Sequence, residues 1–159
     1  MTKVHDSLRE GWDTRSQPGE PGQLSVWVGQ VGVDAGAVIP KRILVVDDEP
    51  GIRRLLRDLF AGEGYVVSEA ADGAAALDRV GVFRPDVVLL DLMMPVMDGW
   101  TFAAECRRIY RDRDVPIIAI SAMFELQRAA AALRALGVRA CLCKPFDVDD
   151  VLSVVEAVV

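Results

Sequence analysis

One pattern runs through most of this chain: a short apolar run is followed by a longer segment whose apolar residues recur at helical spacing. In the first pair, residues 43–46 are all apolar, and the helical stripe after Pro50 is then made by Ile52, Leu55, Leu56, Leu59 and Phe60. The alternation predicts strands at 43–46, 65–69, 86–90, 115–120 and 138–143. It predicts one helix that begins at Pro50 and further helices over 73–83, 99–110, 125–136 and 148–159.

The expected strands are typical of a parallel sheet that is buried on both faces. Three of them are solid apolar runs, whereas a strand with one solvated face would alternate apolar and polar residues. Right-handed crossovers then place helices on both sides of the sheet. Residues 41–159 are therefore predicted to form a doubly wound α/β domain with five strands and five helices.

Residues 1–40 do not share this pattern. Prolines and glycines interrupt every candidate periodicity, so we expect a flexible, disordered N-terminal extension. Residues 24–33 alternate weakly, which leaves a short strand or a docking segment as the alternative. A second hypothesis is that translation starts further along, near Val33 or Val38.

Polar side chains stand where the expected strands end. They are Asp47, Asp48, Glu49, Asp91, Ser121 and Lys144. Taken singly, an aspartate or Ser121 could cap the helix that follows, and Lys144 could simply be solvated. The carboxyl ends of strands in a doubly wound sheet form one rim, where ligands bind. We therefore expect the three aspartate carboxylates, a hydroxyl and an ammonium group at one site.

Carboxylates that lie this close to one another require a cation to neutralise them. They repel one another, and at least one takes up a proton unless a cation lies between them. The expected ligands are all oxygen atoms, which favours Mg²⁺ over Ca²⁺ or Zn²⁺. Lys144 adds a compact charge suited to a phosphoryl oxygen, in a chain whose other lysines are only Lys3 and Lys41. The rim is therefore predicted to bind Mg²⁺ and phosphate.

Composition limits the other classes of function. The chain has 18 Lys and Arg against 24 Asp and Glu, a net charge of −6, so direct binding to nucleic acid is not expected. The basic stretch at 107–113 is interrupted by Asp112, and we interpret it as a solvated helix end. The sequence shows neither a bilayer-spanning apolar run nor a secretory signal, which predicts a cytoplasmic protein without membrane insertion.

The cysteines agree with a reducing compartment. Cys106, Cys141 and Cys143 are too few for a disulfide framework. The Cys-x-Cys pair and a single distant His5 would make a poor zinc site. We therefore interpret the cysteines as buried, small packing residues.

Four motifs in order resemble one known family. They are VVDDEP at 45–50, PDVVLLDLMMPVMDG at 85–99, PIIAISA at 116–122 and KPF at 144–146. Together they resemble the receiver domain of two-component response regulators, and the resemblance covers residues 41–159. It implies a flavodoxin-like sheet with strand order 2-1-3-4-5 and a cis peptide bond between Lys144 and Pro145.

The resemblance also implies a role for each site residue. Asp91 would accept a phosphoryl group from the phosphohistidine of a histidine kinase, while Ser121 and Lys144 would hold phosphoryl oxygens. The Mg²⁺ ligands would be Asp48, Asp91 and the backbone carbonyl of Met93, with Asp47 acting mainly through a bound water.

Such a module is a signalling switch and not an enzyme. The reactions it promotes are only its own phosphorylation and its own slow dephosphorylation. Movement of Ser121 toward the phosphoryl group would bias the fourth helix and fifth strand. The chain ends with the fifth helix, so we expect a stand-alone module. Its expected partners are a histidine kinase or phosphotransfer protein and a downstream partner protein, and a phosphorylation-dependent dimer also fits.

The sequence departs from the family at some positions. Cys141 stands where the family usually has an aromatic residue that swings inward, so the usual aromatic coupling is not expected. Met93 and Met123 stand two residues after Asp91 and Ser121, where family side chains line the path of the hydrolytic water. Thioethers orient water poorly, which predicts slow self-dephosphorylation, unless both methionines only fill gaps beside the sheet.

Three other classes of function fit the sequence less well. A phosphatase of the haloacid-dehalogenase type would need a second aspartate two residues after Asp91, where this chain has Met93. A nucleotide- or flavin-binding module would need a phosphate-binding loop after the first strand, where three acidic residues stand instead. A phosphorylation-independent binding module would not need the rim residues that this chain has.

Overall fold

The computed structural model describes residues 39–159, and the side chains of residues 123–128 lie outside that description. The extension expected over 1–40 falls almost wholly outside the described residues, as does the alternative strand at 24–33. No described helix combines the length and the apolar character that crossing a bilayer requires.

Five strands alternate with five helices along the described part of the chain. The strands are β1 (Arg42–Val46), β2 (Val66–Ala70), β3 (Val87–Asp91), β4 (Ile117–Ala122) and β5 (Val138–Lys144). The helices are α1 (Pro50–Gly62), α2 (Gly73–Phe83), α3 (Gly99–Ile109), α4 (Met123–Ala135) and α5 (Val148–Val158). Every element predicted after residue 41 is present.

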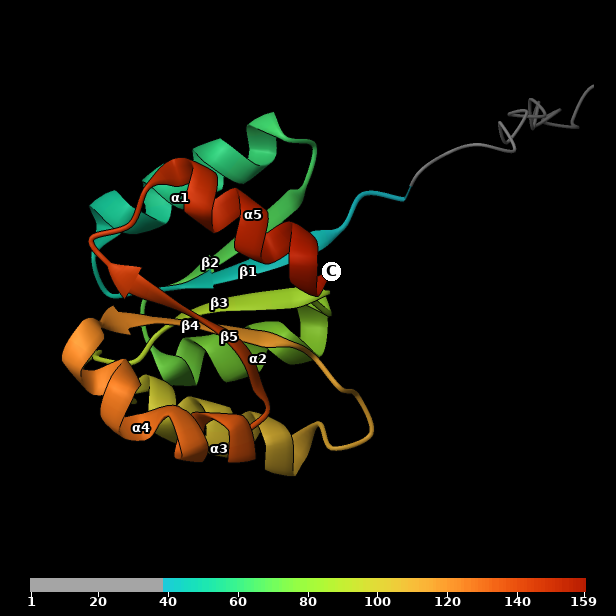
Figure 1. Ribbon diagram of the computed structural model, residues 1–159. Coiled ribbons are helices and arrows are strands. Elements are labelled where there is room, and N and C mark those ends of the chain that lie inside the picture. Colours follow the sequence, from blue (N-terminus) through green and yellow to red (C-terminus); the bar gives the residue numbers. More distant parts are fainter. Residues whose placement is uncertain (1–38) are drawn as a thin grey trace, which may run out of the picture. The chain divides into compact units, whose positions relative to one another are not determined.

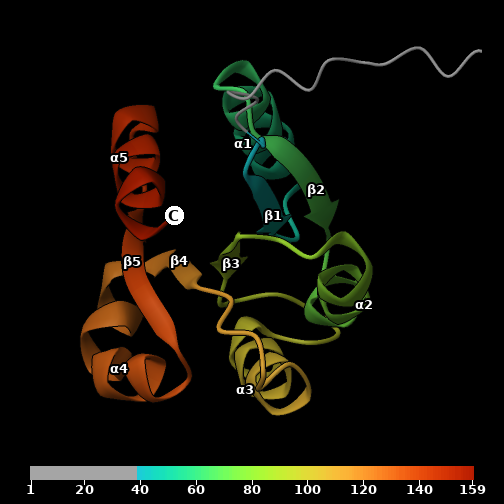
Figure 2. The ribbon, with the colours of Figure 1, turned by 90° about the vertical axis from the view of Figure 1, so that its right-hand side faces the viewer.

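The strands form a single parallel sheet in the order β2-β1-β3-β4-β5. Helices α1 and α5 cover one face, and α2, α3 and α4 cover the other, as Figure 1 and the turned view in Figure 2 show. Both the doubly wound fold and the predicted strand order are confirmed. The arrowheads of β4 and β5 point the same way in Figure 1, which places the carboxyl ends of the strands at one edge of the domain.

Side chains of the central strands alternate between two cores. Ile43 and Val45 pack with Phe60 of α1 and Val155 of α5 on one face of the sheet. On the other face, the core contains residues of α2, α3 and α4 together with Leu44 and other strand residues. All five residues of β3 are buried, as expected for a central parallel strand. Because the strands are buried, the polar residues at their ends stand on a rigid support.

Two helices on one side of the sheet begin at aspartate caps. The Asp72 carboxylate accepts a hydrogen bond from the backbone N–H of Ala75, and Asp98 accepts one from Thr101. In contrast, α1 begins after Glu49 and α4 after Ala122, and neither of these residues makes a side-chain cap. Asp47, Asp48 and Ser121 are therefore not the caps of the helices that follow them.

Strand β4 extends further than its apolar run predicts. The predicted strand ended at Ile120, but Ser121 pairs with Cys143 and Ala122 pairs with Lys144 of β5. Asp91 and Lys144 likewise form the last residues of their strands instead of following them. Strand pairing depends on the neighbouring backbone, so polar residues at strand ends stay in the ladder.

The interpretation of the cysteines as buried was right for Cys106 and wrong for Cys141. Cys106 is buried, Cys143 is half-buried and Cys141 is exposed. The reason is that β5 is an edge strand with an irregularity at its start, where Ile117 pairs with Val138 but Ile118 pairs with Ala140. After this shift, Ala140 and Leu142 pack into one core, and Cys141 lies on the opposite side of the strand.

Candidate functional site

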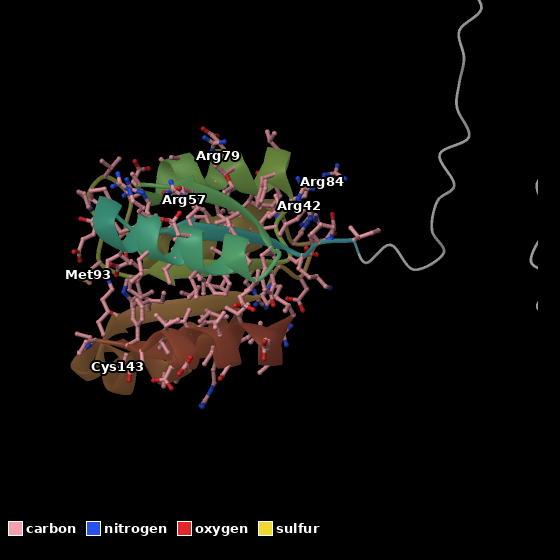
Figure 3. All side chains as sticks on the ribbon, turned by 90° about the horizontal axis from the view of Figure 1, so that it is seen from above. Arg42, Arg57, Arg79, Arg84, Met93 and Cys143 are labelled. Atoms are coloured by element: carbon pink, nitrogen blue, oxygen red, sulfur yellow. The ribbon has the colours of Figure 1, made fainter. Side chains whose placement is uncertain are left out.

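The predicted site residues meet at the carboxyl ends of four strands. Asp47 directly follows β1, and Asp91 ends β3. Val46 pairs with Leu90 and Asp91 pairs with Ile120, so the ends of β1, β3 and β4 lie at the same level of the sheet. Figure 3 shows Met93 and Cys143 at this end of the domain and Arg42 and Arg84 at the other.

Three of the aspartates form one acidic cluster. Asp47, Asp48 and Asp91 each have a carboxylate oxygen within 4.8 Å of the others. Asp47 and Asp91 are buried, at 1% and 5% exposure, while Asp48 is exposed. The structure therefore combines two desolvated carboxylates with one that remains open to solvent.

Lys144 lies between the buried carboxylates. Its Nζ atom is 2.6 Å from Asp91 Oδ2 and 3.0 Å from Asp47 Oδ2. Glu49 approaches more loosely, with its Oε1 atom 3.9 Å from the same nitrogen. One ammonium group thus faces several acidic side chains, which leaves the cluster with excess negative charge.

Burial and charge shift the ionisation of this cluster. Burial raises the pKa of Asp47 above its usual value, although the Glu49 backbone hydrogen bond and Lys144 act in the opposite direction. Burial alone would lower the pKa of Lys144, but its hydrogen bonds to Asp91 and Asp47 outweigh this and raise it. The lysine therefore stays protonated, and the cluster favours a second cation.

Backbone groups fix the orientation of both buried carboxylates. The N–H of Met93 donates to Asp91 Oδ1 over 2.9 Å, and the N–H of Glu49 donates to Asp47 Oδ1 over 2.8 Å. Each aspartate therefore uses one oxygen to hold its own loop and the other to meet Lys144. Side chains held on both sides are pre-organised for binding or reaction.

Arg53 is a site residue that the sequence analysis missed. Its Nη1 group donates to the carbonyl oxygens of Asp47 and Asp48, at 2.7 Å and 3.0 Å. These bonds tie the acidic loop to the first turn of α1. Its position was the one usable signal, because residue 53 lies one turn into the helix that starts at Pro50 and can reach back to the loop.

Replacing Arg53 with alanine is expected to weaken Mg²⁺ binding about tenfold, because the carboxylates lose the support that orients their loop. Isothermal titration of the wild type and the variant with MgCl₂ measures this. Arg54→Ala is the matched control, since Arg54 is an exposed neighbour on the same helix. Equal Mg²⁺ affinities for Arg53→Ala and wild type would contradict the positioning role.

Ser121 and Met93 occupy different surroundings within the site. Ser121 is only 2% exposed and lies in β4, one residue beyond the partner of Asp91. The Met93 side chain is 60% exposed, so it does not fill a gap beside the sheet. The side chain of Met123 lies outside the described residues. The cis peptide bond expected between Lys144 and Pro145 is present.

The donor set fits a small, hard divalent cation. All the clustered ligand atoms are carboxylate oxygens, and one of the three carboxylates faces solvent, which leaves room for water. Among the described residues, no histidine or cysteine belongs to a cluster of this kind. This arrangement suits Mg²⁺ and disfavours a Zn²⁺ site.

The fold and this site define a class of signalling protein. Over residues 43–156, the sequence matches the family described as response regulator receiver domain. The chain belongs to this family, whose members are receivers of two-component signal transduction. The resemblance read from the four sequence motifs is thereby confirmed.

Individual relatives agree with this assignment. Sporulation initiation phosphotransferase F of Bacillus subtilis is 40% identical over 116 residues, which cover 73% of this chain and 91% of the relative. Transcriptional regulatory protein PdtaR of Mycobacterium tuberculosis is 36% identical over 127 residues, and the chain spans 60% of its length. The match to PdtaR therefore concerns only part of that protein.

Solved structures show the same fold. Chemotaxis protein CheY4 of Vibrio cholerae superposes with a TM-score of 0.71 at 30% identity, covering 76% of this chain and all of CheY4. Response regulator TrrA of Thermotoga maritima, solved in complex with Mg²⁺ and BeF, gives a TM-score of 0.64 at 33% identity and covers 75% of this chain and 99% of TrrA.

Proposed function

We propose that this receiver domain accepts a phosphoryl group on Asp91 from the phosphohistidine of a histidine kinase or phosphotransfer protein. The observation that carries the proposal is the position of Asp91, which is buried at the end of β3, oriented by the Met93 N–H and paired with Lys144. No other described carboxylate combines membership of the acidic cluster with a hydrogen bond from Lys144 and a place on the central strand.

The transfer forms one O–P bond and breaks one P–N bond. A carboxylate oxygen of Asp91 attacks phosphorus, the P–N bond to the donor imidazole breaks, and its electron pair stays on the imidazole nitrogen. The product is an acyl phosphate. Lys144 already bonds Asp91 Oδ2, so its ammonium group is placed to follow the added phosphoryl oxygens and neutralise their charge.

Asp47, Asp48, Asp91 and the backbone carbonyl of Met93 would hold Mg²⁺. When bound, the ion neutralises negative charge on the carboxylates and on the phosphoryl oxygens that approach them. The raised pKa of Asp47 supports this role, because a desolvated carboxylate gains from a nearby cation. Lys144 would neutralise charge on Asp47 and Asp91, which it already contacts.

Ser121 would bind the phosphoryl group and pass the change on to the rest of the domain. It sits in β4 directly before α4, and its strand partner is Cys143 next to Lys144. A movement of Ser121 would therefore act on α4 and β5 together. Cys141 is exposed on β5 and carries no ring, so an aromatic swing at that position is not part of the mechanism.

In this proposal, the domain is a signalling switch and not an enzyme acting on other substrates. It would receive its phosphoryl group from a kinase or phosphotransfer protein and act on a downstream partner protein, with a phosphorylation-dependent dimer as a further state. The acidic cluster occupies the place of a nucleotide phosphate loop, which supports this role over nucleotide binding at the same end of the sheet.

Treatment with acetyl phosphate and Mg²⁺ tests the proposal. We expect the wild type to gain the mass of one phosphoryl group, and Asp91→Asn to gain none. Asp78→Asn is the control, because Asp78 is an exposed carboxylate on α2. Phosphorylation of Asp91→Asn at the wild-type level would overturn the assignment.

The phosphorylated domain is expected to lose its phosphoryl group slowly, because Met93 and Met123 offer no strong hydrogen-bonding group to orient water. Substituting Met93→Asn or Met123→Glu should shorten the phosphoryl half-life severalfold. Intact mass spectrometry after removal of acetyl phosphate measures the decay. An unchanged half-life in both variants would show that these positions do not control hydrolysis.

A further inference from the structure

A large cavity lies at the end of the sheet opposite the acidic cluster. It has a volume of about 530 Å³ and is formed by the end of α3, the loop before β4, the end of α4 and the start of β5. In Figure 1 these segments lie away from the arrowheads of β4 and β5. The volume falls within the range of roughly 300–1,000 Å³ for small-molecule sites.

Arginine dominates the lining of this cavity. The arginines are Arg107, Arg111, Arg113, Arg134 and Arg139, and the single acidic lining residue is Asp114. The charged side chains of the lining therefore sum to +4, in a chain whose net charge is −6. Such a concentration of guanidinium groups around one hollow favours anions with several charges.

Among the side chains that the structure describes, four of these arginines make no ion pair. Within the described part of the chain, the one ion pair made by a lining arginine joins Arg139 to Asp114. Exposed Arg108, just outside the cavity, pairs with Glu105. The arginines that face the hollow therefore keep their donors available for a ligand.

Two of these arginines can be placed against other residues of the lining. A Cβ atom on Gly137 would lie 3.1 Å from Arg107 Nη1, so this α3 side chain reaches the start of β5. Burial raises the pKa of Cys106 to about 11, and the positive charge of Arg113 acts in the opposite direction. Residues from α3 and the following loop thus converge on one space.

Helix ends account for only part of this charge. Arg107 and Arg134 lie in the last turns of α3 and α4, where a cation interacts favourably with the helix dipole. Arg111, Arg113 and Arg139 lie beyond those turns, in the loop before β4 and in β5. The dipole therefore does not explain why they gather at the same cavity.

An apolar hollow adjoins the arginine-lined cavity. It has a volume of about 310 Å³ and shares Arg134, Val138 and Arg139 with the larger space. The rest of its lining is Ala130, Leu133, Ala140 and Cys141. Arginine faces stack well on flat aromatic systems, so the junction can hold a planar group next to bound phosphates.

We propose that the two hollows form a binding site for a nucleoside polyphosphate, with the phosphates in the arginine-lined cavity and the base in the apolar one. The inference concerns the amino ends of β4 and β5 and does not depend on the phosphoacceptor proposal. It also revises the interpretation of residues 107–113 as merely a solvated helix end, because the fold adds Arg134 and Arg139 to them.

Isothermal titration of the full chain with ATP in EDTA tests this site without a contribution from Mg²⁺ at the acidic cluster. We expect one ATP per chain, with adenosine and pyrophosphate each binding at least roughly tenfold more weakly, because each fills only one hollow. ATP binding should persist in Asp91→Asn. Pyrophosphate binding as tight as ATP, or loss of ATP binding in Asp91→Asn, would overturn the proposal.

Arginine variants locate the site. The double variant Arg107→Ala/Arg134→Ala should weaken ATP binding about a hundredfold, since it removes two charge-assisted contacts. Arg79→Ala, an exposed arginine on α2 labelled in Figure 3, should bind ATP as the wild type does. Unchanged ATP affinity in the double variant would overturn the proposal.

Two further measurements cover the remaining outcomes. The variant Arg107→Lys/Arg134→Lys keeps both charges and should bind ATP with intermediate affinity, which tests the site even if the alanine variant fails to fold. Backbone amide signals of Gly137 and Arg139 should shift when ATP is added. A single-stranded RNA that binds more tightly than ATP and is not displaced by it would overturn the assignment to a nucleotide.

Discussion

Lys144→Ala is expected to lower the free energy of unfolding in EDTA by about 2 kcal/mol while it raises the affinity for Mg²⁺. Removing the ammonium group leaves Asp47 and Asp91 as buried carboxylates without their shared partner. Breaking a fully buried pair costs roughly 3–5 kcal/mol, and we expect less here because the Lys144 side chain is 25% exposed. Mg²⁺ would then be the main cation available to these oxygens.

Urea unfolding at several Mg²⁺ concentrations measures both effects. The stability lost by Lys144→Ala should shrink as Mg²⁺ rises, because an ion that binds the folded state alone stabilises it. Lys144→Arg keeps the positive charge and is the control, with a smaller loss in EDTA. A deficit in Lys144→Ala that is independent of Mg²⁺ would contradict a shared site for the lysine and the ion.

Gly99→Ala is expected to lower the free energy of unfolding by about 3 kcal/mol and to slow phosphorylation of Asp91. A Cβ atom at position 99 would lie 2.3 Å from the Asp91 carbonyl oxygen and 2.7 Å from the Leu92 Cα atom. Both contacts involve backbone atoms, so either the start of α3 or the end of β3 must move. The second movement displaces the phosphoacceptor itself.

Gly51→Ala is the matched control for this prediction. Gly51 lies in the first turn of α1, as Gly99 does in α3, but no atom lies within 4 Å of its added Cβ. Alanine should therefore leave the stability unchanged or raise it by up to about 1 kcal/mol. Urea unfolding followed by circular dichroism compares the two variants, and equal midpoints would contradict the close packing at Gly99.

The sequence was sufficient for the fold because its local patterns agree with one another. Solid apolar runs such as 87–90 predict buried parallel strands, and the helical stripe after Pro50 predicts a covering helix. What it could not provide was the effect of neighbouring strands. The pairing of Ser121 with Cys143 and the irregularity before Ala140 arise between strands, so the extent of β4 and the exposure of Cys141 were not predictable.

The site was predictable to the extent that its residues stand at strand ends. Parallel topology brings Asp47, Asp91 and Lys144 together once the strand order is known. Arg53 was missed because its bonds go to backbone carbonyls, which leave no charge pattern in the sequence. The arginine-lined cavity was missed because Arg134 and Arg139 join residues 107–113 only in the folded domain.

The residue that carries the phosphoryl group can be identified chemically. The wild type would be treated with acetyl phosphate and Mg²⁺ and then reduced with borohydride, which converts an aspartyl phosphate to homoserine. Peptide mass spectrometry would locate the change. We expect homoserine at position 91 and at no other aspartate. Homoserine at another position, or none at all, would contradict the assignment of Asp91 as the phosphoacceptor.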